Sequence, residues 1–134
     1  MLLQPRKRNY KKIKQNKLRK LGFKGTKVIF GSVGLKTTTS GLISARQLEA
    51  ARRSITRKLQ KKGKVWVRIF PDYPVTDKPS ESRMGKGTGS ISFWSSQVLA
   101  GKIIFEVAGV PTADAVKALI AGGYKLPLKT RILV

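Results

Sequence analysis

The sequence predicts an α+β fold in which two helices pack on one face of a mostly antiparallel sheet, preceded by a basic N-terminal arm. Two observations predict it. The patterns along the chain run in the order strand, helix, several strands, helix and strand, as expected for helices layered on an antiparallel sheet. The first 36 residues carry 12 Lys or Arg and no acid, whereas the remaining 98 carry 17 basic and 6 acidic residues. We therefore expect an arm over residues 1–27 and a single domain over 28–134.

The first strand is expected within residues 28–39. The letters VIFGSVGLKTTT are rich in alternating and β-branched side chains, which is typical of strands. Gly31 and Gly34 suit a bulge or a turn, so this stretch is interpreted as a strand or the entry to a hairpin.

A helix is expected from Ala45 to Lys62. Ser44 followed three residues later by Gln47 fits a capping box, and Gly63 ends the run of helix formers. At 100° per residue the helix divides into two opposite faces. The apolar stripe holds Leu48, Ala51, Ile55 and Leu59 with Ala45 beside it, and the cationic ridge holds Arg46, Arg53, Arg57 and Lys61.

The cationic ridge predicts contact with a run of phosphates. A helix face that is merely solvated usually mixes charges of both signs to gain i,i+4 pairs. Here Glu49 is the one acid of the helix. We therefore favour phosphate contact over an ordinary solvated face.

The segment after this helix is predicted to be a strand and then a long loop. Residues 64–70, KVWVRIF, alternate with Val65, Val67 and Ile69 on one face. Pro71, Pro74 and Pro79 are expected to end regular structure, leaving a loop over residues 71–89, and a loop this long in a small domain is usually functional.

The glycine-rich end of that loop, residues 83–89, lacks the residue order of a nucleotide-binding loop. Arg83, Met84 and Lys86 lie among its glycines. Glycines let a phosphate backbone approach closely, so we predict contact with a phosphate backbone there, with a mobile surface loop as the alternative.

The C-terminal part predicts strands at 90–94 and 102–107, a short helix and a last strand. The helix is expected to begin at Thr112, which can cap it, while Asp114 favours the helix dipole. Gly122 and Gly123 are expected to end this helix. Residues 126–134 then form an edge or closing strand.

The residue types exclude most catalytic chemistry. Cys and His are absent, which removes disulfides, the usual zinc ligand sets, thiol nucleophiles and imidazole proton transfer. The six acids are scattered and predict no convergent pair for acid–base catalysis. We expect no enzyme activity, no cofactor and no metal.

The net charge of +23 predicts a polyanionic partner that neutralises it. The longest uncharged stretch, residues 87–101, has 15 residues and cannot span a bilayer. A membrane-surface role is disfavoured because the apolar stripe of the first helix is rich in Ala.

The N-terminal arm is predicted to bind a polyanion. Its composition predicts poor order in isolation. A cleaved targeting peptide is disfavoured because Ser is absent before Ser32 and no apolar segment is present, and a solvated tail is the remaining alternative. Tyr10 is the best candidate for stacking on bases. The candidate polyanion-binding residues of the arm are Arg6, Lys7, Arg8, Tyr10, Lys11, Lys12, Lys14, Lys17, Arg19 and Lys20.

Three segments carry a family resemblance. They are SARQLEAARR at 44–53, GKVWVRIFPDYPVTDKP at 63–79 and SRMGKGTGS at 82–90. With further matches from residue 1 to residue 132, the chain resembles the bacterial or organellar type of large-subunit ribosomal protein sixteen.

The resemblance implies a hammerhead-like α/β sandwich that is a structural constituent of the large ribosomal subunit. It implies ribosomal RNA and neighbouring large-subunit proteins as partners, and a place near the elbow of the aminoacyl-site transfer RNA. The arm and the loop around Arg83 are implied to reach into RNA. The alternative of another class is a free-standing nucleic-acid-binding protein or RNA chaperone, which would bind duplex DNA comparably.

The expected compartment is the mitochondrion. The match begins at Met1, which leaves no room for an import presequence, so we expect translation in the compartment where the protein works. Lys outnumbers Arg by 19 to 10 and Ile is frequent, as expected of an AT-rich mitochondrial gene. A plastid or the bacterial cytoplasm is the alternative.

Overall fold

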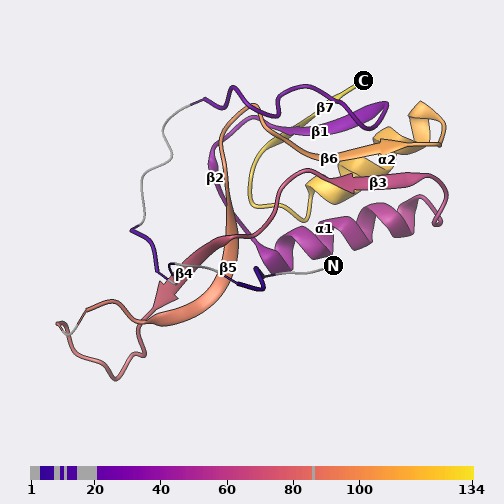
Figure 1. Ribbon diagram of the computed structural model, residues 1–134. Helices are drawn as coiled ribbons and strands as arrows, with labels where there is room; N and C mark the ends of the chain where they lie inside the picture. Colours follow the sequence, from indigo (N-terminus) through magenta and orange to yellow (C-terminus); the bar gives the residue numbers. More distant parts are fainter. Residues whose placement is uncertain (1–3, 8–9, 11, 15–20, 86) are drawn as a thin grey trace.

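The chain forms seven strands and two helices in the part that the computed structural model describes, which is residues 4–7, 10, 12–14, 21–85 and 87–134. Figure 1 shows their arrangement. The elements in order are β1 (Val33–Thr37), β2 (Gly41–Ser44), α1 (Ala45–Lys58), β3 (Lys64–Val67), β4 (Tyr73–Asp77), β5 (Ser90–Val98), β6 (Ile103–Ala108), α2 (Thr112–Gly123) and β7 (Thr130–Leu133). The predicted α+β class is confirmed.

The strands form two sheets where a single sheet was predicted. One has the order β3-β6-β1-β7 and the other β2-β5-β4, and all neighbouring strands are antiparallel. The connections β1–β2 and β5–β6 change sheet at the same place, where the Gly101 N–H donates to the Thr37 carbonyl at 2.8 Å and the Ala100 N–H donates to Ser40 Oγ at 2.8 Å. The residues predicted as the entry to a hairpin, 28–39, therefore supply β1 and lead into the second sheet.

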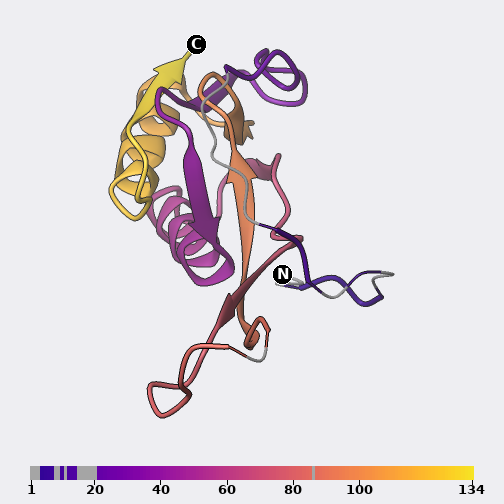
Figure 2. The ribbon, with the colours of Figure 1, turned by 90° about the vertical axis from the view of Figure 1, so that its left-hand side faces the viewer.

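Both helices cover one face of the four-stranded sheet, as Figure 2 shows. The apolar stripe predicted for the first helix is buried, with Leu48, Ala51 and Ile55 fully covered. Val65 and Val67 of β3 pack against the same core, as their alternation predicted. The remaining core residues that are fully or almost fully buried are Val33, Leu35, Ile43, Leu59, Ile69, Val98, Ile104, Phe105, Val107, Ala115, Ala118 and Leu119.

Helix α1 begins where predicted and ends earlier. The Gln47 N–H donates to Ser44 Oγ at 3.2 Å and the Ser44 N–H donates to Gln47 Oε1 at 2.9 Å, so the capping box is confirmed. The predicted end at Lys62 is wrong: Leu59 is the C-cap, and Gln60 and Lys61 have φ values of 52° and 62°. The helix ends there because the chain must reverse after its last core contact, Leu59, to begin β3 at residue 64.

Helix α2 begins at Thr112, but its predicted cap is wrong. Pro111 is the N-cap and no side chain caps the helix, because Thr112 already lies in the first turn. Gly122 and Gly123 form the end of the helix, with Tyr124 as C-cap. Among the described residues, neither helix is long and apolar enough to cross a membrane.

The predicted loop over residues 71–89 begins with a strand. Residues 73–77 form β4, and Pro74 pairs with Trp94 of β5. Proline is tolerated because β4 is the edge strand of its sheet, where one side of the backbone needs no hydrogen bond. The loop is therefore shorter, over residues 78–89. The last strand is also shorter than the predicted 126–134, at 130–133.

Residues 21–32 lie across the outer face of the four-stranded sheet, on the side away from the helices (Figure 2). The Gly22 N–H donates to the Ala100 carbonyl at 2.9 Å, and the Ile103 N–H donates to the Gly25 carbonyl at 2.9 Å. Residues 21–27, assigned to the arm by the sequence, are thus bonded to the domain. The division into an arm over 1–27 and a domain over 28–134 stays a prediction.

Candidate RNA-binding surface

Helix α1 presents the cationic ridge to solvent. Arg46, Arg53 and Arg57 are all exposed, on the side opposite the buried stripe. Lys61, the fourth predicted member, is exposed but lies beyond the end of the helix in a left-handed conformation. The ridge on the helix therefore has three members, and Lys61 belongs to the turn before β3.

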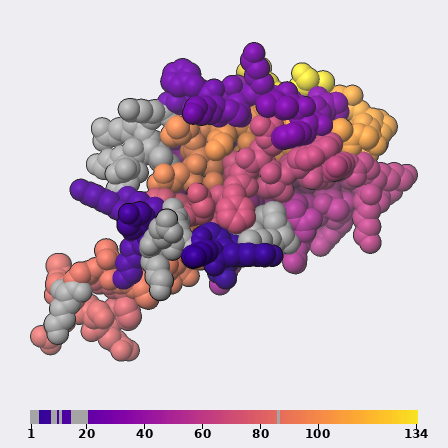
Figure 3. Space-filling model, in the orientation of Figure 1, coloured from indigo at the N-terminus to yellow at the C-terminus, as the bar shows by residue number. Residues whose placement is uncertain are grey.

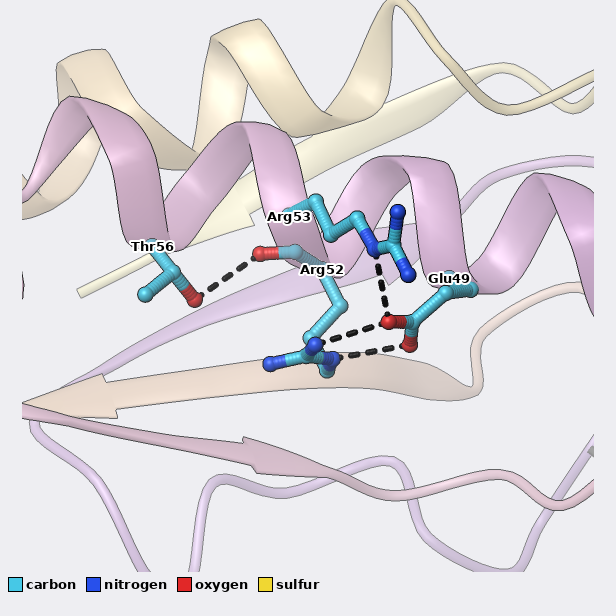
Figure 4. A network of polar contacts seen from close by, with 4 residues as sticks. All are labelled: Glu49, Arg52, Arg53 and Thr56. Atoms are coloured by element: carbon cyan, nitrogen blue, oxygen red, sulfur yellow. Dashed lines mark hydrogen bonds and ion pairs between the residues drawn. The ribbon is translucent and has the colours of Figure 1, made fainter. Parts of the chain in front are cut away.

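The acid of α1 is paired with two arginines, as Figure 4 shows. Arg52 donates through Nε at 2.8 Å and Nη2 at 2.7 Å to the Glu49 carboxylate, and Arg53 Nε donates at 3.0 Å. The hydrogen bond from Arg52 outweighs the opposing effect of burial and, with Arg53, lowers the pKa of Glu49 from 4.5 to about 2. Arg53, a predicted member of the cationic ridge, is thus paired with the one acid of the helix.

The pairing still leaves cationic groups for a partner. The Arg53 side chain stays 71% exposed, so Glu49 fixes one edge of its guanidinium while much of the group faces solvent. Among the described residues, Arg46 and Arg57 form no ion pair. The ridge is therefore two unpaired arginines and one that Glu49 orients.

The β4–β5 hairpin carries the predicted glycine-rich loop away from the body of the protein (Figures 1 and 2). Arg83 and Met84 are exposed at its tip. Gly85 and Gly87 have φ values of 103° and 82°, and, apart from their neighbours in the chain, no atom of the described residues lies within 4 Å of a Cβ built on either. Lys78 Nζ donates to the Gly85 carbonyl at 2.8 Å. The tip thus has turns that favour glycine and open space around them.

Part of the N-terminal segment lies against this hairpin, and Figure 3 shows its described residues in indigo beside the hairpin. Lys12 Nζ donates to the Thr88 carbonyl at 3.2 Å, and the Tyr73 hydroxyl donates to the Lys14 carbonyl at 3.2 Å. Nearer the N-terminus, Gln4 of the same segment and Arg46 of the ridge line one open pocket of about 620 Å³ at the start of α1. The segment therefore contacts the hairpin and shares a pocket with Arg46 of the ridge.

The other predicted residues of the N-terminal segment divide into two groups. Arg6, Lys7 and Tyr10 are exposed. The remaining candidates, which lie outside the described residues, are Arg8, Lys11, Lys17, Arg19, Lys20 and the loop residue Lys86. The RNA contacts of all candidate residues, described or not, stay predictions.

The sequence did not predict a buried carboxylate beneath residues 29–31. Glu106 Oε2 accepts the N–H groups of Ile29 at 3.2 Å, Phe30 at 2.6 Å and Gly31 at 2.9 Å, and its other oxygen is paired with Arg68. Burial alone would raise the pKa of Glu106, but these four hydrogen bonds lower it. The sequence did contain an indication of this group, because the strand IIFEVA is apolar except for one acid. A charged acid that is buried requires a partner.

The chain was compared with known proteins. Residues 5–133 match the family model of Ribosomal protein L16p/L10e. Proteins named large ribosomal subunit protein uL16 are 45% identical in Psychrobacter cryohalolentis, 47% in Bartonella henselae and 47% in Caulobacter vibrioides. Each alignment covers 98% of this chain and 96%, 96% and 92% of the respective relative. These matches confirm the predicted resemblance, and the chain belongs to the L16p/L10e family of ribosomal proteins.

Proposed function

We propose that this chain, a structural and non-enzymatic constituent of the large ribosomal subunit, binds folded ribosomal RNA through three cationic elements. These are the ridge of α1, the tip of the β4–β5 hairpin and the N-terminal segment. The observation that carries the proposal is their proximity: the N-terminal segment contacts the hairpin through Lys12 and shares a pocket with Arg46.

The charge of this surface supports a polyanion as its ligand. Arg46, Arg57 and Arg83 are exposed and, among the described residues, form no ion pair. Arg46 and Arg57 lie on α1, and Arg83 lies in the loop of the β4–β5 hairpin. These cations come from separate parts of the sequence. A folded RNA offers phosphates in several directions at once, and recognition of this kind depends on RNA shape more than on base sequence.

Salt titration of binding to large-subunit ribosomal RNA tests this proposal. Cations that neutralise phosphates release counterions, so the logarithm of the affinity should fall linearly with the logarithm of salt concentration. Neutralising one contacting arginine, as in Arg57→Gln, should reduce that slope by about 1. Binding that is insensitive to salt, or that is equally tight for duplex DNA, would contradict the proposal and favour the free-standing nucleic-acid-binding protein.

We also infer that the hairpin tip faces the transfer RNA in the aminoacyl site. The support is the family resemblance together with the projection of the hairpin from the body (Figure 2). The chain has no cysteine, so Met84→Cys introduces a single attachment point for an iron chelate that generates hydroxyl radicals. Reconstituted ribosomes should show cleavage of aminoacyl-site transfer RNA from position 84. Cleavage that is absent, or equal from a Lys117→Cys control on α2, would contradict this placement.

The protein acts at the ribosome. The cell compartment of that ribosome is part of the proposal, and the mitochondrion is the expected one. The ratio of 19 Lys to 10 Arg favours a mitochondrial gene product, with a plastid as an alternative. The relatives named above are bacterial; they give the mitochondrion no support and favour the bacterial cytoplasm. Cell fractionation followed by detection of the chain distinguishes these compartments, and recovery with cytoplasmic bacterial ribosomes would refute the mitochondrial assignment.

A further inference from the structure

A row of two cations and two aromatic rings lies on the outer face of the four-stranded sheet, away from the helices. The guanidinium carbon of Arg68 is 4.8 Å from the centroid of the Phe30 ring. Phe30 stacks on Trp66, with ring centroids 6.3 Å apart and planes 21° from parallel. Lys64 Nζ is 5.1 Å from the Trp66 centroid. This stacked row of Arg68, Phe30, Trp66 and Lys64 shares no residue with the surface proposed above to bind RNA.

The stacked row is held in place from beneath by Glu106. The Phe30 N–H donates to Glu106 at 2.6 Å, and Arg68 is paired with the same carboxylate. The next residue, Gly31, presses against β6, because a Cβ built on it would lie 2.7 Å from the Val107 carbonyl oxygen. The backbone of Phe30 and the side chain of Arg68 are therefore both fixed by one buried group.

Phe30 remains 57% exposed despite this fixation. A large apolar ring held in water gains nothing for the isolated protein, because hydrophobic burial is the favourable process. A rigid exposed ring does lower the entropy cost of binding a partner, since it needs no ordering on association. The stacked row thus has the properties of a binding site.

The charges around the ring favour a nucleic-acid partner over an apolar protein segment. Lys64 lies over the Trp66 ring, and Lys24 and Lys27 are exposed on the same segment as Phe30. The charge of Arg68 is paired with Glu106. Glu106, the carboxylate with which the row is bonded, is fully buried. A partner with flat rings and negative charges matches this arrangement, because bases stack on aromatic side chains while cations meet the phosphates.

We propose that the stacked row binds an unpaired base of RNA against Phe30, with the adjoining phosphates near Lys64 and Lys27. This rests on the proposed RNA-binding function and adds a second surface to it. Stacking should contribute to affinity without releasing counterions, which separates it from the phosphate contacts of the α1 ridge.

Binding of the full chain to a fluorescein-labelled single-stranded oligoadenylate, followed by anisotropy across a range of salt concentrations, tests the stacked row. Phe30→Leu should weaken binding about 5-fold or more, as expected for the loss of one base–aromatic stack. The slope against salt should stay unchanged. Phe30→Trp should bind at least as tightly as the wild type. Tyr124→Leu, which removes an aromatic ring at an 83% exposed residue outside the row, should have no effect.

The proposal is overturned if Phe30→Leu binds like the wild type, if Tyr124→Leu weakens binding equally, or if Phe30→Trp is as weak as Phe30→Leu. It is also overturned if ultraviolet crosslinking of assembled large subunits joins the Phe30 peptide to a protein and to no nucleotide. Failure of the proposed function would look different: the wild-type chain would not co-sediment with large subunits at all. A co-sedimenting chain that is insensitive to Phe30→Leu refutes the stacking site alone.

Discussion

Replacing Glu106 by Gln should remove the anchor that ties residues 29–31 to the sheet. The carboxylate is fully buried, accepts three backbone N–H groups and pairs with Arg68. A glutamine can present one acceptor oxygen in place of two, so its NH₂ group must face a donor. Arg68, whose side chain is 16% exposed, loses its counter-charge. Breaking a buried pair in this way costs about 3–5 kcal/mol.

Urea denaturation followed by circular dichroism measures this loss. With a slope near 2 kcal/mol per molar urea, the midpoint should fall by about 2 M. Glu81→Gln, which changes an exposed carboxylate in the hairpin loop, is the matched control and should leave the midpoint in place. Loss of less than about 1 kcal/mol in Glu106→Gln would refute the conclusion that this carboxylate anchors the segment.

The effect of Glu106→Gln should also depend on pH in one direction. Because the folded state lowers the pKa of Glu106 below 4.5, the carboxylate stabilises the protein fully above that value. The contribution is lost as the pH falls through the folded pKa, since the protonated acid no longer pairs with Arg68. The difference in unfolding free energy between wild type and variant should therefore be largest near neutral pH and shrink below pH 4.5. A difference that is constant with pH would contradict the ionised pair.

Three further substitutions test other parts of the structure. Ser44→Ala should destabilise the protein by about 1 kcal/mol in urea denaturation because it removes the cap of α1, whereas Thr112→Ala, which removes no capping bond, should not. Arg57→Gln should change the unfolding free energy by less than about 0.5 kcal/mol, since the side chain is exposed, while weakening binding to large-subunit ribosomal RNA. Glu49→Gln should lower stability at neutral pH. Because the pKa of Glu49 is lowered from 4.5 to about 2, its effect should be lost as the pH falls between those values, and equal destabilisation at pH 2 and pH 7 would contradict the pairing with Arg52.

Local patterns predicted the elements of this fold well. The capping box at Ser44 involves two residues three positions apart, so the start of α1 could be predicted without knowledge of the rest of the chain. The alternation of Val65 and Val67 likewise predicted which face of β3 packs on the core. Both depend on interactions between near neighbours or on simple periodicity.

Features that depend on distant contacts could not be predicted in the same way. The end of α1 is set by the position of β3, so helix formers at Gln60 and Lys61 occupy a turn with positive φ. Pro74 was expected to exclude a strand, but it lies on a sheet edge that the sequence does not reveal. The separation of the strands into two sheets depends on pairing between β1 and β6, which are more than 60 residues apart.

In the candidate site, too, features set by local patterns were predicted and features set by other contacts were not. The exposed cations of α1 and the hairpin tip were predicted from spacing and composition, and Arg46, Arg57 and Arg83 are exposed as expected. The pairing of Arg53 with Glu49 depends on side-chain conformation. Glu106 is separated by 75 to 77 positions from the backbone groups it binds, so periodicity alone gave no partner for it.

Gradient sedimentation of the full chain with large ribosomal subunits tests the central claim most directly. The account predicts that the wild-type chain sediments with the subunit. The triple variant Arg46→Gln, Arg57→Gln and Arg83→Gln, whose wild-type side chains are all exposed, should fold normally and remain in the light fractions. A wild-type chain that stays at the top of the gradient, or a triple variant that incorporates as fully as the wild type, would contradict the claim.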